Sequence, residues 1–453
     1  MSRSGRSSIM TMPVRFFDGR HACSCRVIIA LFLLTVTVRA SIAQGVGTTP
    51  AVLTLRALLD SVQTHPTSLA AESRVRAARG SRVTAGAFGN PMLSYQVDQT
   101  PFPGGHPLIG MEREAMTTAT LPLEFLYQRG PRVSRANADL RAAQSEALLA
   151  KRRLALDAAA AYYRVAIAQV QVATSRDLLG WLDTLVTYNR SRVHEGVAAE
   201  ADLIRSELER DRVAAETAMQ EAERAQARSS LAGFISASPG TGANLTVAVD
   251  DAPFALPGFV GSIDARPDVQ AARERVTASN AAVASERTML VRQLGATIGT
   301  MQTGHMTSMI AGVSLPVPVF DQNRGEIQRT AAEHDAASYE LASQQRAANA
   351  ELQGALDAAR ILTERASVLV RRDSSGFLAR ADESRRIALG AYREGAVPLF
   401  QVIDAARAWV DARMTYYRTI AAQHQSVLSL LVAQGLDLSS ALPDVTSRGA
   451  SIR

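Results

Sequence analysis

The chain runs twice through one order of elements, and this duplication constrains its fold more than any other feature. In the first half a helical stretch opens at His65-Pro66, two strand-like segments follow, and a long helix begins. The second half opens at Arg266-Pro267 and repeats that order. Leu121-Pro122 and Arg129-Gly130 match Leu315-Pro316 and Arg324-Gly325, at offsets of 194 and 195 residues. Two sequence offsets that differ by only one residue indicate an internal repeat.

The join between strand and helix is clearest in "GVSLPVPVFDQNRGEIQRTAAEHDAA", from Gly312 to Ala337. Its alternating pattern breaks at the prolines, which a central strand and a helix interior both disfavour. We predict that Pro122, Pro316, Pro318, Gly130 and Gly325 form the two strand-to-helix elbows. Each following helical pattern runs for about 65 to 70 residues, which is roughly 100 Å if unbroken. Ordinary helices have about 10 to 14 residues.

Each long helical pattern is interrupted by a short segment that has a counterpart in the other repeat. The segment from Tyr188 to Glu207 corresponds to the segment from Tyr392 to Trp409, with Glu195-Gly196 aligned to Glu394-Gly395. Glycine after a helix-ending turn is the expected stop signal, and apolar periodicity resumes at once afterwards. The two marks therefore predict the tips of two helical hairpins.

The returning helix of the second repeat carries two apolar stripes. One follows alternating spacings of three and four, interrupted by Arg413 and His424; it comprises Leu399, Ile403, Ala406, Val410, Tyr417, Ile420, Val427 and Leu431. Val402, Trp409 and Tyr416 add an adjacent stripe. Two stripes predict two neighbouring helices and hence a wall of helices, whereas a two-stranded coiled coil needs only one.

The sequence has four strand-like segments, and apolar and polar residues alternate only weakly along them. Leu93, Tyr95 and Val97 alternate with polar residues, and threonine, glycine and alanine are common in all four. This pattern is typical of strands with lipid on one side and a polar lumen on the other. Four strands cannot close a barrel, because the smallest have about eight. We therefore expect the barrel to be shared between chains.

The first 43 residues have the features of a secretory signal. A basic lead precedes the apolar run Val27 to Val38, and Ser41 and Ala43 satisfy the rule for cleavage after Ala43. The run is too short to span a bilayer in the mature protein, although a single membrane anchor is the alternative. Translation could begin at Met1 or at one of the two methionines at positions 10 and 12.

Removal of this segment changes the charge and the cysteine content. The whole chain has a net charge of +6, but residues 1–43 hold six arginines and one acid, so the remainder is at +1. This gives no reason to expect nucleic acid as a partner. Cys23 and Cys25 both precede the apolar run. We therefore expect no disulfide, no lipid anchor and no metal site from this pair.

An enzyme would need a constellation of reactive residues, and the sequence has none. Phosphate-binding glycine loops, HExxH and GxSxG are absent, and the seven histidines do not cluster. His194-Glu195 lacks a further ligand, so we predict no catalytic, cofactor or metal site. Met301, Met306 and Met309 look like a soft-metal cluster but fall in strands or their connection, which favours core or lipid contact. The remaining alternative is an exported coiled-coil structural or adaptor protein, although an adaptor normally has one hairpin between β domains.

The chain resembles the TolC-type outer membrane efflux proteins over nearly the whole mature sequence. The resemblance rests on "SLPVPVFDQNRGEIQRTAAEHDAA" and on the segment from Tyr392 to Gly435, with its tip glycine, Asp404 and terminal Ala-x-Gly. The Phe-Asp-x-Asn-Arg-Gly after the second elbow is similar to the heavy-metal cation efflux branch. The resemblance implies a mainly α fold with a small β part. Three copies would form a 12-stranded outer membrane barrel continued by a periplasmic α-helical barrel.

The resemblance also implies partners and sites. The tips around Glu195, Gly196, Glu394 and Gly395 would dock a periplasmic adaptor, which would join the homotrimer to an inner membrane pump of the resistance-nodulation-division (RND) type. A gate would lie just above the tips. Family gate acids occur six and nine residues after the tip glycine, positions that hold Asp202, Gln401 and Asp404. Gln401 departs from the acidic pattern, and solvated helix faces are the alternative for the two aspartates.

We predict the following organisation and cargo. The cargo is heavy-metal cations or, second, drugs, passing through a passive duct. Gln99 to Gly110 forms a cell-surface loop, and a short strand lies at Leu245 to Val249. A signal peptide (1–43) precedes the first repeat (44–233), which has strands at about 89–98 and 113–124 and a helical hairpin at about 128–233. A linker (234–262) leads to the second repeat (263–435), which has strands at about 293–301 and 306–318 and a helical hairpin at about 325–435. The tail (436–453) is expected to be short and loosely ordered.

Overall fold

The structure is a computed structural model of the chain, and it describes residues 52–98, 113–235, 245–258, 262–291, 294–370 and 376–442. The predicted signal peptide and the predicted surface loop from Gln99 to Gly110 lie outside these residues.

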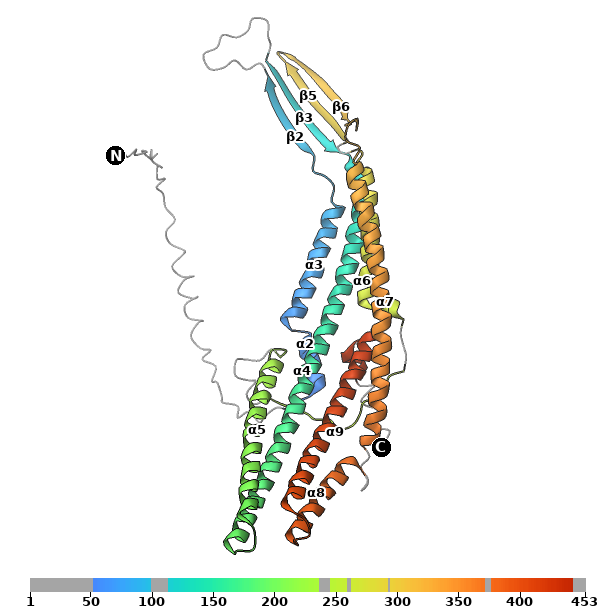
Figure 1. Cartoon of the computed structure of the whole chain (residues 1–453). Coiled ribbons are helices and arrows are strands. Elements are labelled where there is room, and N and C mark those ends of the chain that lie inside the picture. Colours follow the sequence, from blue (N-terminus) through green and yellow to red (C-terminus); the bar gives the residue numbers. More distant parts are fainter. Residues whose placement is uncertain are drawn as a thin grey trace, which may run out of the picture. The chain divides into compact units, whose positions relative to one another are not determined.

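The described elements follow the duplicated order (Figure 1). The first repeat consists of β1 (Val52–Leu53), α2 (Leu55–Val62), α3 (Pro66–Gly86), β2 (Met92–Asp98), β3 (Glu114–Pro122), the 3-10 turn η1 (Glu124–Leu126), α4 (Arg129–His194) and α5 (Glu200–Ala232). The linker contributes β4 (Thr246–Val247). The second repeat consists of η3 (Ile263–Ala265), α6 (Pro267–Thr288), β5 (Gly295–Thr303), β6 (Met306–Ser314), α7 (Arg324–Leu369), α8 (Phe377–Arg393) and α9 (Leu399–Ala433).

Helix starts follow the residues that marked the repeat. α3 and α6 both begin with a proline at the first helical position, where its missing N–H is not needed. α4 and α7 begin at the arginine of the two matched Arg-Gly pairs. α4 runs unbroken for 66 residues and accommodates Pro131 because that proline lies in its first turn. The predicted long helix is therefore confirmed in the first repeat.

The four longer strands form one antiparallel sheet in the order β2-β3-β5-β6. Its register places Leu93, Ala119, Ile298 and Ala311 in one cross-strand row, while Ser94 and Thr118 lie in the next row on the opposite face. The Ser94 and Thr118 hydroxyl oxygens are 2.7 Å apart, and those of Thr120 and Thr297 are 3.0 Å apart. The sheet thus has one face rich in apolar side chains and one face with polar pairs.

The helices next to the sheet follow the same lateral order as the strands. α3 contacts α4, α4 contacts α6, and α6 contacts α7, so each strand of the sheet has a helix in the corresponding position. At the hairpin end the order is α5, α4, α9 and α8. Figure 1 shows this arrangement of the helices. Within the described chain, β2 and β6 are the outer strands of the sheet, and α3 and α7 are the outer helices beside it.

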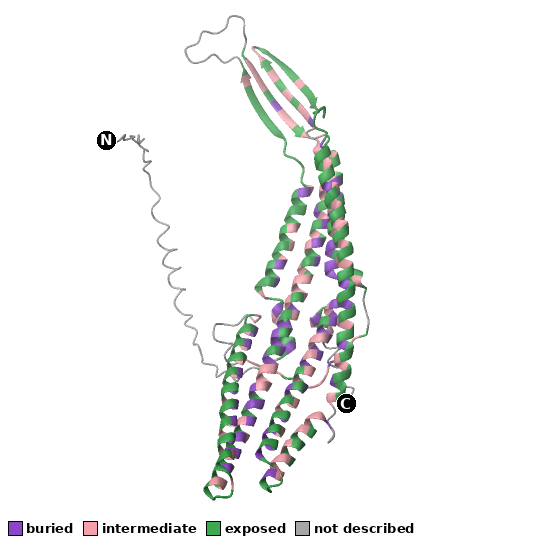
Figure 2. Ribbon diagram, viewed as in Figure 1, coloured by how far each residue is buried: buried purple, intermediate pink, exposed green. Residues whose placement is uncertain are grey.

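The largest core cluster lies where α2, α4, α7 and α9 meet β4 and the linker. Alanines on α4 are buried there, including Ala158 and Ala159, and small side chains let the helices approach closely. Of the two stripes predicted on α9, Val402, Trp409 and Tyr416 are buried, and so are most members of the first stripe. The distribution of buried residues along these helices is visible in Figure 2. α9 contacts three helices, α4, α7 and α8, so the predicted wall of helices is confirmed and α9 has one neighbour more than the two stripes indicated.

The linker is fixed to two helices by glutamine side chains. Gln169 on α4 accepts from Val247 N at 3.0 Å and donates to Val247 O at 3.2 Å. Gln423 on α9 does the same with Phe254, at 3.0 and 2.8 Å. The predicted short strand exists as β4, which pairs in parallel with β1. Each glutamine therefore replaces the hydrogen bonds that a neighbouring strand would make.

Two expectations need correction. The helical pattern of the second repeat is not continuous, since α7 ends at Leu369 and α8 begins at Phe377. Gly376, a weak helix former, is the extended N-cap of α8, so α8 begins as a separate helix. The tail is not loose throughout either. Leu438 and Leu442 are buried in the main core cluster because their apolar side chains meet it directly.

Candidate functional site: the hairpin tips and the helices above them

Both predicted tips are helix stops of one type. After α4, Gly196 has φ +72°, Gly196 N donates to Val193 O at 3.0 Å, and Val197 N donates to Arg192 O at 2.9 Å. After α8, Gly395 has φ +75°, and the two matching bonds are 3.0 and 2.8 Å. This is the Schellman arrangement, in which a left-handed residue lets two amides bond the last carbonyls of the helix. The tips are where the sequence predicted them.

Glycine at the tips is required by backbone conformation and not by space. A Cβ added at Gly196 or Gly395 meets no atom within 4 Å. The requirement is the positive φ, which L residues with a Cβ rarely adopt. Glu195 and Glu394, just before the glycines, are both exposed. The tips therefore present carboxylates and open backbone.

An apolar cluster joins the two hairpins just above the tips. Its members come from α4, α5, α8 and α9, and the buried ones are Leu178, Leu182, Leu185, Val213, Tyr392, Leu399, Val402, Ile403, Ala406 and Trp409. Tyr392 donates its hydroxyl to Asn189 Oδ1 at 2.8 Å, and its ring lies edge-on to Tyr188. Burial, followed by the nearby Asp202 carboxylate, raises the pKa of Tyr392. The side chain thus stays a neutral donor that connects the second tip to α4.

The three candidate gate residues lie on the helices that return from the tips. Asp202 is in the first turn of α5, where the helix dipole favours an acid, and it is partly buried. Gln401 and Asp404 are exposed on the first two turns of α9. Among the described residues of one chain, no hydrogen bond or ion pair links these three side chains. Their suggested role as a gate stays a prediction.

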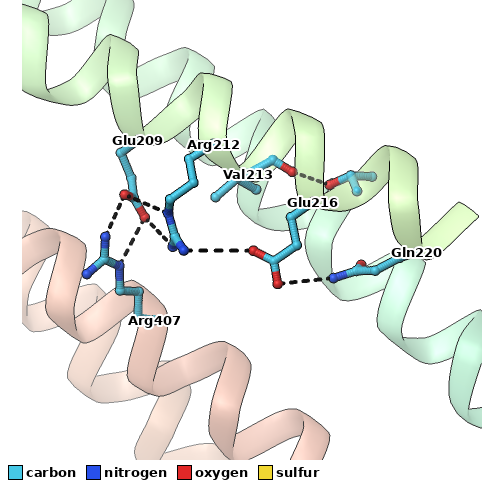
Figure 3. Close-up of polar contacts among 7 residues, drawn as sticks. Glu209, Arg212, Val213, Glu216, Gln220 and Arg407 are labelled. Carbon is cyan, nitrogen blue, oxygen red and sulfur yellow. Dashed lines mark hydrogen bonds and ion pairs between the residues drawn. The ribbon is translucent and has the colours of Figure 1, made fainter.

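A polar cluster missed by the sequence analysis lies farther along α5 (Figure 3). Glu209 on α5 has a side chain only 9% exposed and accepts from Arg407 of α9, Nε to Oε1 at 3.0 Å and Nη2 to Oε2 at 2.6 Å. Arg212 bonds the same carboxylate at 2.9 and 3.2 Å and pairs with Glu216 at 3.9 Å. We call these four residues the Glu209 cluster. It connects the first hairpin to the second by a paired, two-bond contact.

The charge state of Glu209 follows from these contacts. Burial acts to raise its pKa, but the hydrogen bonds from Arg407 and Arg212 outweigh this effect, so the pKa of Glu209 lies below its usual value. The carboxylate is therefore ionised throughout the neutral range. No spacing rule could have revealed this bond, because its partners are 198 residues apart.

The two elbows differ in how they are built. In the first, β3 ends at Pro122, and η1 leads into α4. In the second, residues 315–323 follow β6, and the buried Asn323 adopts φ 54° while its amide donates to Glu286 O and Oε2 at 3.0 and 2.9 Å. A Cβ at Gly130 or Gly325 would meet nothing within 4 Å, so these glycines are not required by space. The turn in the second elbow thus depends on Asn323.

Neither a metal site nor a membrane-spanning helix occurs in the described residues. Their histidine, cysteine and acidic side chains form no group of three or more that could hold a metal ion, and His194 is an exposed residue at the first tip. None of the described helices combines the length and apolar character needed to cross a bilayer.

Comparison with known proteins adds the family. Residues 262–436 match the family model for outer membrane efflux proteins. The predicted resemblance to this family is confirmed. It is 27% identical over 313 residues to the nickel and cobalt resistance protein CnrC of Cupriavidus metallidurans, covering 66% of this chain and 71% of that one. It is 27% identical over 286 residues to the nickel-cobalt-cadmium resistance protein NccC of Alcaligenes xylosoxydans xylosoxydans, covering 61% and 64%.

A solved structure has the same fold. The outer-membrane channel OprN matches with a TM-score of 0.70 and 20% identity, over 85% of this chain and 90% of that one. The predicted TolC-like fold and outer membrane location are confirmed. Family and fold are those of efflux channels in the outer membrane and not of enzymes.

Proposed function

We propose that this outer membrane efflux protein works as a homotrimeric passive duct. The observation that carries the proposal is the pair of outer strands: in the described chain β2 and β6 each bond a neighbour on one side only. Long strand edges with free N–H and C=O groups are not tolerated in lipid. If β6 of one copy pairs with β2 of the next, three copies give 12 strands, which exceeds the smallest barrels of about eight.

The exposed side chains of the sheet are consistent with a closed barrel of three copies. Leu93 and Tyr95 on β2 are exposed, as are Met309 and Val313 on β6. These residues belong to the sheet face that carries the apolar rows, so that face suits contact with lipid. The polar rows, with the paired hydroxyls of Ser94 and Thr118, suit a water-filled lumen.

The opposite end suits a partner in the periplasm. Two tips of one conformation end two hairpins that a shared apolar cluster holds together. We propose that they dock a periplasmic adaptor, which connects the duct to an inner membrane RND-type pump. Asp202 and Asp404, each repeated by a threefold axis, would form acidic rings near the narrow end, while Gln401 leaves one of the expected acidic positions uncharged. Such rings favour cations.

The cargo that we propose is divalent transition-metal cations, with drugs as the second class. Support comes from the two relatives named for nickel, cobalt and cadmium resistance. Expression in a strain that lacks the outer membrane component of its own metal-efflux system should restore growth on nickel or cobalt. Gly395→Trp, made in the same plasmid, serves as the matched control. Restored growth on drugs alone would favour the second class, and no rescue of either kind would contradict the proposal.

A further inference from the structure

The strand-to-helix elbow of the second repeat exposes a run of apolar side chains. Leu315, Val317 and Val319 are exposed, and Phe320 is 100% exposed. A phenylalanine with no contact on any side is unusual, because burying such a ring is among the strongest apolar contributions available. Phe320 lies three residues before Asn323, the buried, left-handed N-cap of α7.

A matching cavity lies beside the elbow of the first repeat. It measures about 550 Å³ and is lined by Thr84, Ala87, Phe88, Pro122, Phe125 and Arg132, among others. The rings of Phe88 and Phe125 meet edge to face at 5.4 Å. Gly89 closes one side, where an added Cβ would come within 2.7 Å of Pro122. Phe88 is itself largely exposed, although the guanidinium of Arg129 lies 5.2 Å from the centre of its ring, so the cavity offers an aromatic surface.

The order of elements indicates what would fill this cavity. The cavity borders the end of α3 and the segment leading into β2, which are the outer helix and outer strand on one side of the chain. Phe320 stands between β6 and α7, the outer strand and helix on the other side. In an antiparallel pairing of β6 with β2 of the next copy, Ser314 ends β6 where Met92 begins β2. That pairing brings the elbow of one copy to the cavity of its neighbour.

We propose that Phe320 of each protomer packs beside the Phe88–Phe125 pair of the adjacent protomer and anchors the junction between barrel and helices. This contact rests on the proposed trimer and specifies its interface. The occupant is a second copy of this chain. A third ring beside an existing edge-to-face pair extends a favourable aromatic geometry.

A photo-crosslinking amino acid of the benzoylphenylalanine type, placed at position 320, tests the contact directly. Illumination of the outer membrane fraction should give covalent dimers and trimers, and mass spectrometry should map the crosslink to residues 81–89 or 122–132. Thr84→Trp in the same chain fills the cavity from within and should abolish the crosslink. Crosslinks that map to any other segment of an intact trimer would overturn the proposal.

Substitution supplies a second measurement. Phe320→Ala should lower the temperature at which the trimer dissociates in detergent, while Phe320→Leu should lower it less. Phe400→Ala is the matched control, since Phe400 is also exposed but lies at the second tip, and it should leave that temperature unchanged. Equal dissociation temperatures for Phe320→Ala and the parent would also overturn the contact. A parent protein that forms no trimer would refute the proposed duct itself.

Discussion

The contact between Glu209 and Arg407 predicts how firmly the two hairpins are held together. Removing the charge by Glu209→Gln breaks a two-bond ionic contact between a glutamate side chain that is 9% exposed and an arginine side chain that is 50% exposed. Charged hydrogen bonds contribute about 1.5 to 3 kcal/mol when buried, and exposed ion pairs about 0.2 to 1 kcal/mol. This half-exposed pair falls between the two, and we expect a coupling free energy of about 1 to 2 kcal/mol.

Native-state hydrogen exchange on the amides of α5 and α9 measures this coupling. Glu209→Gln and Arg407→Gln should each raise the local opening equilibrium of both helices by about 5- to 30-fold, and the double variant should add little more. Arg212→Gln is the matched control. It removes an arginine from the same carboxylate but leaves the bond between α5 and α9. A coupling below about 0.3 kcal/mol, which is within ordinary additivity, would refute the reasoning.

The same bond sets a pH dependence with a defined sign. The pKa of Glu209 in the folded protein is lowered from the ordinary value of 4.5. The stabilisation is therefore fully present above that value and is lost as the pH falls through the lowered pKa of the folded state. Protection of α5 and α9 should stay constant from neutral pH down to about 5 and fall at lower pH, whereas Glu209→Gln, which has no ionisable group at this position, should lack the part of that fall that Glu209 causes.

Two further predictions concern the tips and the gate. Gly196→Ala and Gly395→Ala should each destabilise a tip by about 1 to 2 kcal/mol, because alanine rarely adopts the positive φ of these positions. Tryptophan at either position should abolish efflux while the trimer stays intact. Unchanged metal resistance of the tryptophan variants would count against docking at the tips. In planar-bilayer recordings, Asp404→Ala should weaken the block of channel current by divalent cations, and Asp202→Ala should add to that effect. Gln401→Asp should strengthen the block. If all three variants behave like the parent protein, these positions are solvated helix faces.

The sequence predicted what short-range patterns encode. The duplicated marks located the start of α4 and α7, and both tip glycines, because helix stops depend on a few neighbouring residues. The prediction of a continuous second helix was wrong, since apolar periodicity alone does not reveal the extended N-cap at Gly376. The boundaries of the long helices were thus predictable wherever a turn residue marked them.

Contacts between the two repeats could not be predicted from spacing. His424 looked like an interruption in an apolar stripe, yet it is buried, stacked on Phe254 at 3.9 Å and bonded to Ala252 O at 2.8 Å. Burial lowers the pKa of His424, so it packs as a neutral ring. Gln423 beside it and the Glu209 cluster depend in the same way on partners more than 150 residues away. These are tertiary bonds, and no local pattern encodes them.

The central claim is that three copies share one barrel, and native mass spectrometry of protein extracted from outer membranes in detergent tests it most directly. The account predicts a single species with the mass of three mature chains, which persists on dilution because each sheet edge is paired with a neighbour. A species of one or two chains, or recovery of the protein from the soluble periplasmic fraction, would contradict it.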